Sequence, residues 1–290
     1  MKQSEEECEM FQRIAVTACS DALPPERRGK VEELLEILRE MELEPVCSRY
    51  IFSDRAPFGV DGRKRAGELE SFYRDASIGG IFDISGGNLA NELLDELDYE
   101  LLQRNSKPFW GYSDLTALLN AVYARTGNPA WLYQIRNMTG SDGARQREEF
   151  AAYLSGKDRR LLEVPWEGVQ GGHMEGVLIG GNIRCFLKLA GTPYMPSFQG
   201  KLLFLESRSG SAALMASFFS QMKQMGVFQK IAGLLLGTFT ELEKNGQTQE
   251  LLRVVRQAAG TKLPVAKTRA VGHGEDSRCL IIGRPYACSF

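Results

Sequence analysis

Short apolar segments alternate with amphipathic ones along the first 130 residues, and this alternation restricts the folds open to the chain. Residues 13–19 form a β-branched run typical of a fully buried strand, and apolar residues then recur at helical spacing from 31 to 41. Further strands are expected at 45–47, 78–85 and 108–112, and helices at 65–74, 90–103 and 114–125. Such alternation predicts a parallel sheet covered on both faces, in a doubly wound, Rossmann-like α/β domain.

The pattern changes between residues 139 and 166, where polar and charged residues replace the alternation. We interpret this stretch as a linker. Beyond it, strands are expected at 176–182, 201–206, 232–239 and 264–271, with helices at 212–225 and 247–259. The sequence therefore predicts an N-terminal domain over residues 1–140, a linker over 141–168 and a smaller C-terminal α/β domain over 169–290. A chain of 290 residues is long enough for two domains.

Charge and hydropathy exclude several classes of partner. The 35 Lys and Arg against 37 Asp and Glu give a net charge of −2, so there is no basic excess to neutralise a phosphate backbone. We therefore do not expect a nucleic acid as a partner. We do not expect a membrane either, because the longest apolar stretches fall far short of the roughly 20 residues of a spanning helix. The first ten residues, MKQSEEECEM, lack the apolar core of a secretory signal. A cytoplasmic location is expected.

The cysteine and glycine patterns indicate neither a metal nor a cofactor. None of the six cysteines belongs to a C-x-x-C pair, so no zinc cluster is expected. A chain of 290 residues is too long to depend on a disulfide framework. The glycine-rich phosphate loops that bind nucleotide cofactors do not occur at any expected strand-to-helix step. The Gly86-Gly87-Asn88 turn after an expected strand is better suited to donate backbone N–H groups to an oxyanion or a carboxylate. The alternative is a plain turn without a role.

Ser113 lies where an expected strand turns directly into a helix, within Gly111-Tyr-Ser-Asp114. Ligands collect at the carboxyl ends of strands in open parallel sheets. A sharp turn at such a place exposes a hydroxyl, and the first N–H of the helix can face an oxyanion. A serine before a helix is more often an N-cap, so from this segment alone both interpretations stay open.

The chain offers two histidines for acid–base chemistry, His173 and His273. His273 directly follows an expected strand and is flanked by glycines, whereas His173 precedes its strand and is expected in a loop. His273 is therefore favoured, although either ring could lie at the surface without a role. Glu206 ends an apolar run, where a carboxylate can orient an imidazole or can simply be a solvated strand end.

Five blocks of this sequence together resemble one family. They cover residues 84–102, 107–127, 175–193, 200–207 and 272–283, and they occur in the family's order. The family is that of the LD-carboxypeptidases, serine peptidases that include murein tetrapeptide LD-carboxypeptidase and the microcin-C immunity peptidases. The Gly-Gly-Asn turn at 86–88 is closer to the immunity-peptidase form.

The resemblance implies a Ser-His-Glu triad. By motif, Ser113 is the nucleophile, His273 the general base and Glu206 the residue that orients the imidazole. Backbone N–H groups of Asp114 and of the turn at Gly86 and Gly87 would form the oxyanion hole. The resemblance also implies a homodimer that acts on a small peptide, and a site shared between the two predicted domains.

The expected function is hydrolysis of an L,D-amide bond to a terminal D-amino acid, as in muramoyl tetrapeptide during cell-wall recycling. One alternative is hydrolysis of microcin-C-like peptidyl-nucleotides or other acyl amides, in self-immunity or detoxification. A non-catalytic module that binds peptidoglycan fragments is a second alternative. The chain departs from the family at 207–211, where members often continue with acidic residues, and at 128–133, where many have a Gly-Pro turn. Substrate contacts can differ there.

Overall fold

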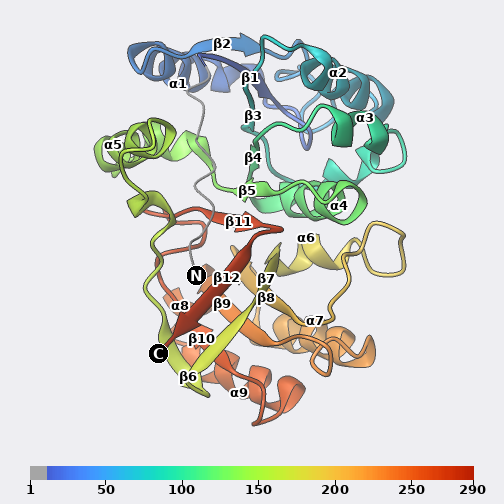
Figure 1. The fold of residues 1–290 in the computed structure, drawn as a ribbon, viewed down its shortest axis with the longest axis vertical. Coiled ribbons are helices and arrows are strands. Elements are labelled where there is room, and N and C mark those ends of the chain that lie inside the picture. Colours follow the sequence, from blue (N-terminus) through green and yellow to red (C-terminus); the bar gives the residue numbers. More distant parts are fainter. Residues whose placement is uncertain (1–11) are drawn as a thin grey trace.

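Two six-stranded sheets, each with its own helices, make up the computed structural model of this chain (Figure 1). The structure describes residues 12–290, so the MKQSEEECEM segment and its cysteine lie outside the described residues. The N-terminal half, blue to green in Figure 1, lies above the C-terminal half, yellow to red. The α/β fold predicted from the sequence is confirmed.

The first sheet is doubly wound. Its parallel strands, in spatial order, are β2 (Glu44–Cys47), β1 (Arg13–Thr17), β3 (Gly80–Asp83), β4 (Phe109–Gly111) and β5 (Ala130–Leu132). Its helices are α1 (Arg28–Glu40), α2 (Gly62–Arg74), α3 (Tyr99–Arg104) and α4 (Thr116–Thr126). Successive strand residues point to opposite faces: Ile14 packs with α1, and Ala15 belongs to the cluster with α2, α3 and α4. Both faces are thus buried, as the continuous apolar runs predict.

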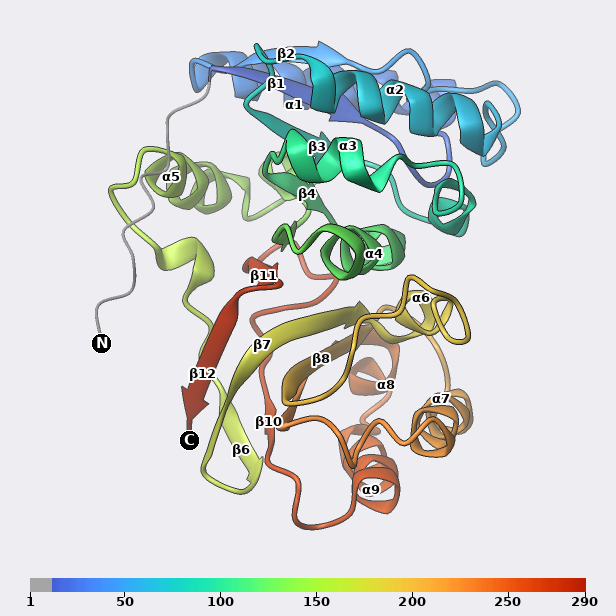
Figure 2. The same cartoon turned by 45° about the vertical axis from the view of Figure 1, so that its right-hand side comes forward.

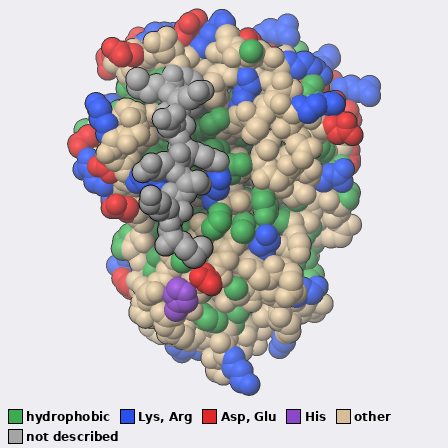
Figure 3. All heavy atoms as spheres, viewed as in Figure 1, with side chains coloured by type: hydrophobic (Ala, Val, Ile, Leu, Met, Phe, Trp, Pro, Cys, Tyr) green, Lys and Arg blue, Asp and Glu red, His purple; other side chains and the backbone are tan. Residues whose placement is uncertain are grey.

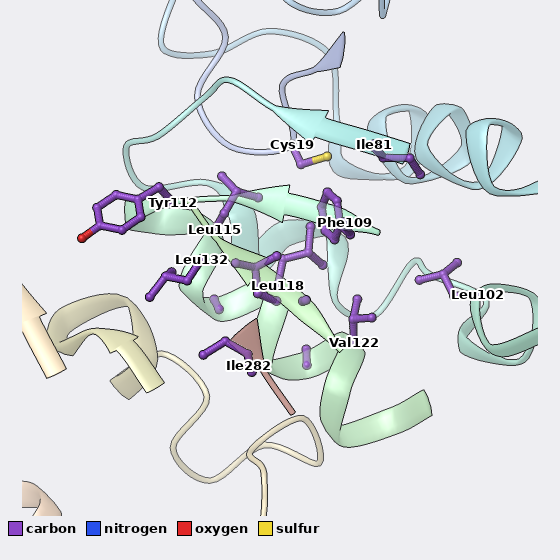
Figure 4. Packing of buried hydrophobic residues seen from close by; sticks show 14 of the residues in the cluster. Cys19, Ile81, Leu102, Phe109, Tyr112, Leu115, Leu118, Val122, Leu132 and Ile282 are labelled. Atoms are coloured by element: carbon purple, nitrogen blue, oxygen red, sulfur yellow. The ribbon is translucent and has the colours of Figure 1, made fainter. Parts of the chain in front are cut away.

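A strand from the far end of the chain completes this sheet. β11 (Leu280–Ile282) pairs antiparallel with β5, and Ile282 lies near Leu118 and Leu132 in the buried cluster of Figure 4. Sheet membership therefore does not follow the predicted boundary at residue 169, and the domain ranges stay a prediction.

The second sheet carries parallel strands in its middle and antiparallel ones at its edges. The order is β12 (Pro285–Ser289), β7 (His173–Asn182), β8 (Lys201–Ser207), β9 (Gly233–Phe239), β10 (Val265–Lys267) and β6 (Glu167–Gln170). Its helices are α6 (Ile183–Leu187), α7 (Ala212–Gln224), α8 (Thr240–Lys244) and α9 (Thr248–Ala259). Leu203 and Leu234 face the cluster with α7 and α9, whereas Leu202 and Phe204 join the core of the first sheet. One continuous core therefore connects the two sheets.

Two local expectations are wrong, and one segment is more structured than expected. The helix expected at 90–103 is a 3-10 turn (Ala90–Leu93) followed by α3, whose N-cap Asp98 accepts a hydrogen bond from the N–H of Leu101 (3.0 Å). The segment interpreted as a linker contains α5 (Gly143–Leu154), and Phe150 of this helix packs on Trp110 with ring centroids 5.5 Å apart. His173 opens β7 and is not a loop residue.

Acidic and basic side chains are interspersed on the face shown in Figure 3. Within residues 12–290, we find no helix with the length and apolarity needed to cross a membrane.

Candidate active site

Ser113 occupies a sharp turn between β4 and α4. Its φ is +59°, in the left-handed region that residues with a Cβ rarely adopt, and a 3-10 turn (Ser113–Leu115) begins there. A side chain at Gly111 would meet the Cβ of Leu115 at 2.9 Å, so glycine permits the tight turn. Strained backbone of this kind gathers at functional sites, and a strand, a turn and a helix in this order form a nucleophile elbow.

The structure brings Ser113, His273 and Glu206 into one series of hydrogen bonds. His273 Nε2 lies 3.0 Å from Ser113 Oγ, and His273 Nδ1 lies 2.6 Å from Glu206 Oε2. With its proton on Nδ1, the ring donates to the carboxylate and leaves the Nε2 lone pair free to accept from the hydroxyl. Both distances are within hydrogen-bond reach for general-base activation of a serine.

Glu206 is fully buried near the end of β8. Its Oε1 accepts a hydrogen bond from Asn182 Nδ2 (2.9 Å), while Oε2 faces the imidazole. A buried carboxylate requires partners of this kind, because an unpaired charge in the interior is costly. Two donors on two oxygens fix the plane of the carboxylate, and the carboxylate in turn fixes the plane of the imidazole.

The ring of Tyr112 packs against one side of the His273 imidazole. Its ring meets the ring of His273 edge-on, with centroids 5.2 Å apart. Its hydroxyl is buried and lies close to the side chains of Ser277 and Glu206. Burial raises the pKa of Tyr112 well above its usual value, and the charge of Glu206 raises it further. The phenol therefore stays neutral beside the site.

The loop that carries His273 is held by the segment at 141–154, within the predicted linker. Gln146 Nε2 on α5 donates to the carbonyl of Ser277 (3.1 Å), and Arg145 Nη2 donates to the carbonyl of Asp276 (3.0 Å). Ser141 donates to Glu275 through its N–H (2.6 Å) and its hydroxyl (2.5 Å). Sequence reasoning missed these supports, because they join segments about 130 residues apart.

The residues expected to form the oxyanion hole lie around Ser113. A Cβ placed on Gly86 would lie 3.8 Å from the Cβ of Ser113, so this glycine faces the serine side chain. Gly87 has a φ of +126°, and a side chain there would overlap the carboxylate of Asp21. The Asp114 carboxylate is buried and pairs with Lys188 (2.5 Å), while its backbone belongs to the 3-10 turn that opens at Ser113.

Polar residues on α4 connect the serine side to the glutamate side. Asn120 donates to the carbonyl of Gly180 (2.8 Å) and accepts from the N–H of the same residue (2.9 Å). Thr116 Oγ1 accepts from the N–H of Asn182 (2.9 Å). Neither residue is among the predicted site residues. Two polar side chains four positions apart, on one face of an otherwise apolar helical run, were the available signal.

The described residues offer no group of three or more side chains suited to hold a metal ion. The five cysteines within residues 12–290 are free thiols. Burial raises the pKa of Cys19, Cys185 and Cys279, so these three thiols are protonated and unreactive at neutral pH.

Family models match both halves of the chain. The model for the LD-carboxypeptidase N-terminal domain matches residues 14–133, and the model for the C-terminal domain of the same family matches residues 175–287. The chain belongs to the LD-carboxypeptidase family. The first match contains Ser113, and the second contains Glu206 and His273. The resemblance of the five sequence blocks is thereby confirmed.

Relatives of known name match this LD-carboxypeptidase-family chain over most of its length. The murein tetrapeptide carboxypeptidase of Pseudomonas aeruginosa is 28% identical over 289 residues, which cover 94% of this chain and 91% of that protein. The microcin C7 self-immunity protein MccF of Escherichia coli is 26% identical over 261 residues, 79% of this chain and 76% of that protein.

Solved structures share the fold of this family member. A muramoyltetrapeptide carboxypeptidase from Oxalobacter formigenes superposes with a TM-score of 0.77 at 21% identity, covering 96% of this chain and 95% of that one. MccF in complex with glutamyl sulfamoyl guanosine superposes with a TM-score of 0.83 at 22% identity, covering 96% of this chain and 93% of that one. The two-sheet α/β architecture is thus common to all three.

Proposed function

We propose that this chain is a serine-type LD-carboxypeptidase that hydrolyses the amide bond before a terminal D-amino acid, as in muramoyl tetrapeptide. The observation that carries the proposal is the hydrogen-bonded series Ser113, His273 and Glu206, at 3.0 and 2.6 Å, in a member of this family. The name of the Pseudomonas aeruginosa relative supports the choice of substrate.

In the proposed reaction, Ser113 Oγ attacks the carbonyl carbon of the scissile amide while His273 Nε2 takes its proton. The N–H groups of Asp114 and of the turn at Gly86 and Gly87 donate to the oxyanion. His273 then returns the proton to the leaving amine, and the D-amino acid departs from an acyl-enzyme. Water, deprotonated by the same imidazole, hydrolyses the ester and restores Ser113.

Glu206 takes no proton in this scheme. Its carboxylate accepts the Nδ1–H of His273, which selects the tautomer with a free Nε2 and stabilises the imidazolium that forms during attack. Burial makes this stabilisation effective, because charges interact more strongly away from water. No step requires a cofactor or a metal ion.

A second candidate function is hydrolysis of a peptidyl-nucleotide or a similar acyl amide. Two observations favour it: the Gly-Gly-Asn turn at 86–88 and the likeness to MccF, whose structure was solved with glutamyl sulfamoyl guanosine. The same three side chains would act on this substrate. The difference would lie in the pocket that binds the leaving group.

We further propose that the protein acts as a cytoplasmic homodimer with an N-terminal domain over 1–140, a linker over 141–168 and a C-terminal domain over 169–290. The family resemblance supports the dimer, and light scattering of the purified protein tests it. A monomer at micromolar concentration would contradict the proposed assembly and leave the proposed chemistry intact.

The decisive experiment incubates the purified protein with muramoyl tetrapeptide and, in parallel, with glutamyl sulfamoyl guanosine. We expect release of free D-alanine from the first substrate, and background release from Ser113→Ala. Cleavage of the second substrate alone would replace the leading function with the second. Tight binding of the tetrapeptide without turnover would instead indicate a non-catalytic module for peptidoglycan fragments. Normal turnover by Ser113→Ala would overturn the mechanism.

A further inference from the structure

Residues 86–90 follow β3 and approach Ser113 through Gly86. This loop begins with two glycines, which have little conformational preference of their own. A loop of this kind does not hold its N–H groups in one direction unless other groups fix it. Its polar contacts therefore show what determines its conformation.

Two carboxylates from the N-terminal half accept hydrogen bonds from the N–H groups of residues 88–90. Asp21 Oδ1 accepts from the N–H of Asn88 (2.7 Å) and of Leu89 (3.2 Å). Asp114 Oδ2 accepts from the N–H of Ala90 (2.9 Å). These contacts engage the donors of residues 88–90 and leave the glycine end of the loop next to Ser113.

Two cationic side chains from the C-terminal half donate hydrogen bonds to oxygens of the same loop. Arg184 donates through Nη2 to the carbonyl of Gly87 (2.8 Å) and through Nη1 to Oδ1 of Asn88 (2.7 Å). Lys188 Nζ donates to the carbonyl of Asn88 (2.7 Å) and to Oδ1 of Asp114 (2.5 Å). Arg184 belongs to α6 and Lys188 is its C-cap, so the four-residue spacing places both side chains on one face.

Burial makes the Lys188 contact the stronger of the two. The side chain of Lys188 is 17% exposed and that of Asp114 is fully buried, whereas Arg184 is exposed. Removing one partner of a buried ion pair leaves the other charge in the interior without compensation. Because the Asp114 carboxylate holds the N–H of Ala90 as well, loss of Lys188 disturbs the loop at two of its residues.

We propose that Lys188 and Arg184 are positioning residues that hold the loop at 86–90 so that its glycine N–H groups face the oxyanion formed at Ser113. Neither side chain touches the substrate in this scheme. The inference rests on the proposed function, because it requires that an oxyanion forms at Ser113. It gives the C-terminal half a second role besides presenting Glu206 and His273. The oxyanion hole is then assembled by both halves of the chain.

The first test compares Lys188→Met and Arg184→Met with a matched control, Lys201→Met. Lys201 opens β8 and also donates across the two halves, to the hydroxyl of Tyr123 on α4 (2.9 Å). It lies five residues before Glu206, about 16 Å along the strand. The control therefore removes a lysine contact between the halves without touching the loop.

We expect kcat of Lys188→Met to fall about 100-fold and that of Arg184→Met about 10-fold, with KM within about 2-fold, because displaced oxyanion donors act on the transition state. Lys188→Arg should recover most of the kcat. Lys201→Met should keep kcat within about 2-fold. An equal loss in Lys188→Met and Lys201→Met, or a loss in KM alone, would overturn the inference.

A second measurement separates this inference from the proposed function. A fluorophosphonate phosphonylates an activated serine: Ser113 Oγ bonds to phosphorus, fluoride leaves, and the serine proton passes to His273. We expect Lys188→Met to slow this labelling about 10-fold or more and Lys201→Met to leave it unchanged. If the wild type labels but releases no D-alanine, the substrate proposal fails and the labelling rates still decide the inference. Unchanged labelling in Lys188→Met would overturn it.

Discussion

The serine side and the histidine side of the site are held in different ways. Ser113 is fixed by its own backbone, in a left-handed turn between β4 and the helix that follows. His273 lies in a stretch between β10 and β11 without helix or strand, and α5 holds that stretch through hydrogen bonds from Gln146 and Arg145. The first side is local in sequence, and the second depends on residues far away in the chain.

This difference shows where each half of the site is vulnerable. A local turn stores strain that neighbouring residues must counteract, so a substitution at Ser113 changes both chemistry and backbone energy. A loop held from outside loses its position when its supports are removed, even if every reacting group remains.

Replacing Ser113 by glycine should produce the largest effect. Activity is expected to fall to background, because the nucleophile is gone. The unfolding free energy of Ser113→Gly should exceed that of Ser113→Ala by about 1 kcal/mol, because glycine adopts a positive φ without the strain that alanine retains. Urea unfolding of the two inactive variants measures this difference directly. Equal stability would mean that the turn stores no strain.

Glu206→Gln should produce the second-largest loss of activity. The amide keeps the shape of the side chain but loses the charge that favours Nδ1–H on His273, so kcat is expected to fall about 1,000-fold or more. Steady-state kinetics on the tetrapeptide measures this loss, and circular dichroism checks the fold. A loss of less than about 10-fold would show that Glu206 does not control the imidazole.

Gln146→Leu tests the external support of the histidine side. It removes the donor to the Ser277 carbonyl, and we expect about a 10-fold loss in kcat through displacement of His273. The control is Gln103→Leu, which removes the hydrogen bond that the exposed side-chain amide of Gln103 donates to the carbonyl of Thr126 (3.1 Å). Similar kcat values for the two variants would contradict the long-range support.

Glu275→Gln should have the smallest effect. The hydroxyl and the N–H of Ser141 lower the pKa of Glu275 below its ordinary value. A lowered folded pKa stabilises the protein above the unfolded value, and this contribution is lost as the pH falls through the folded pKa. The wild type should therefore be slightly more stable than Glu275→Gln at pH 7 but not at pH 3, as urea midpoints will show. A difference that persists at pH 3 would contradict this assignment.

The alternation of apolar runs with amphipathic segments in the first 130 residues is enough to predict the parallel sheet, because strands that are buried on both faces have continuous apolar sequences. The strands β5 and β11 were not predicted: each has three residues, and β11 joins the sheet only by pairing with β5, about 150 positions earlier in the chain. The predicted linker shows the same limit. Its surface is polar and charged, yet Phe150 within it packs into the aromatic core beside Trp110.

At the site, the sequence leads to the three side chains by two separate arguments. Position at strand ends selects Ser113, Glu206 and His273 as candidates, and family resemblance assigns each a role. Neither argument reaches Gln146 or Lys188. Their contributions come from contacts across 131 and 74 positions of the chain, and no local pattern encodes such a contact.

The pairing of β11 with β5 also determines when the protein can finish folding as it is synthesised. Residues 280–282 leave the ribosome after the rest of the first sheet, so β5 presents an open edge until then. Open edges pair readily with strands of other chains, and partly made chains are prone to such errors. A chain cut short before residue 280 therefore leaves β5 as the edge strand of the first sheet, where a strand of another copy can pair with it.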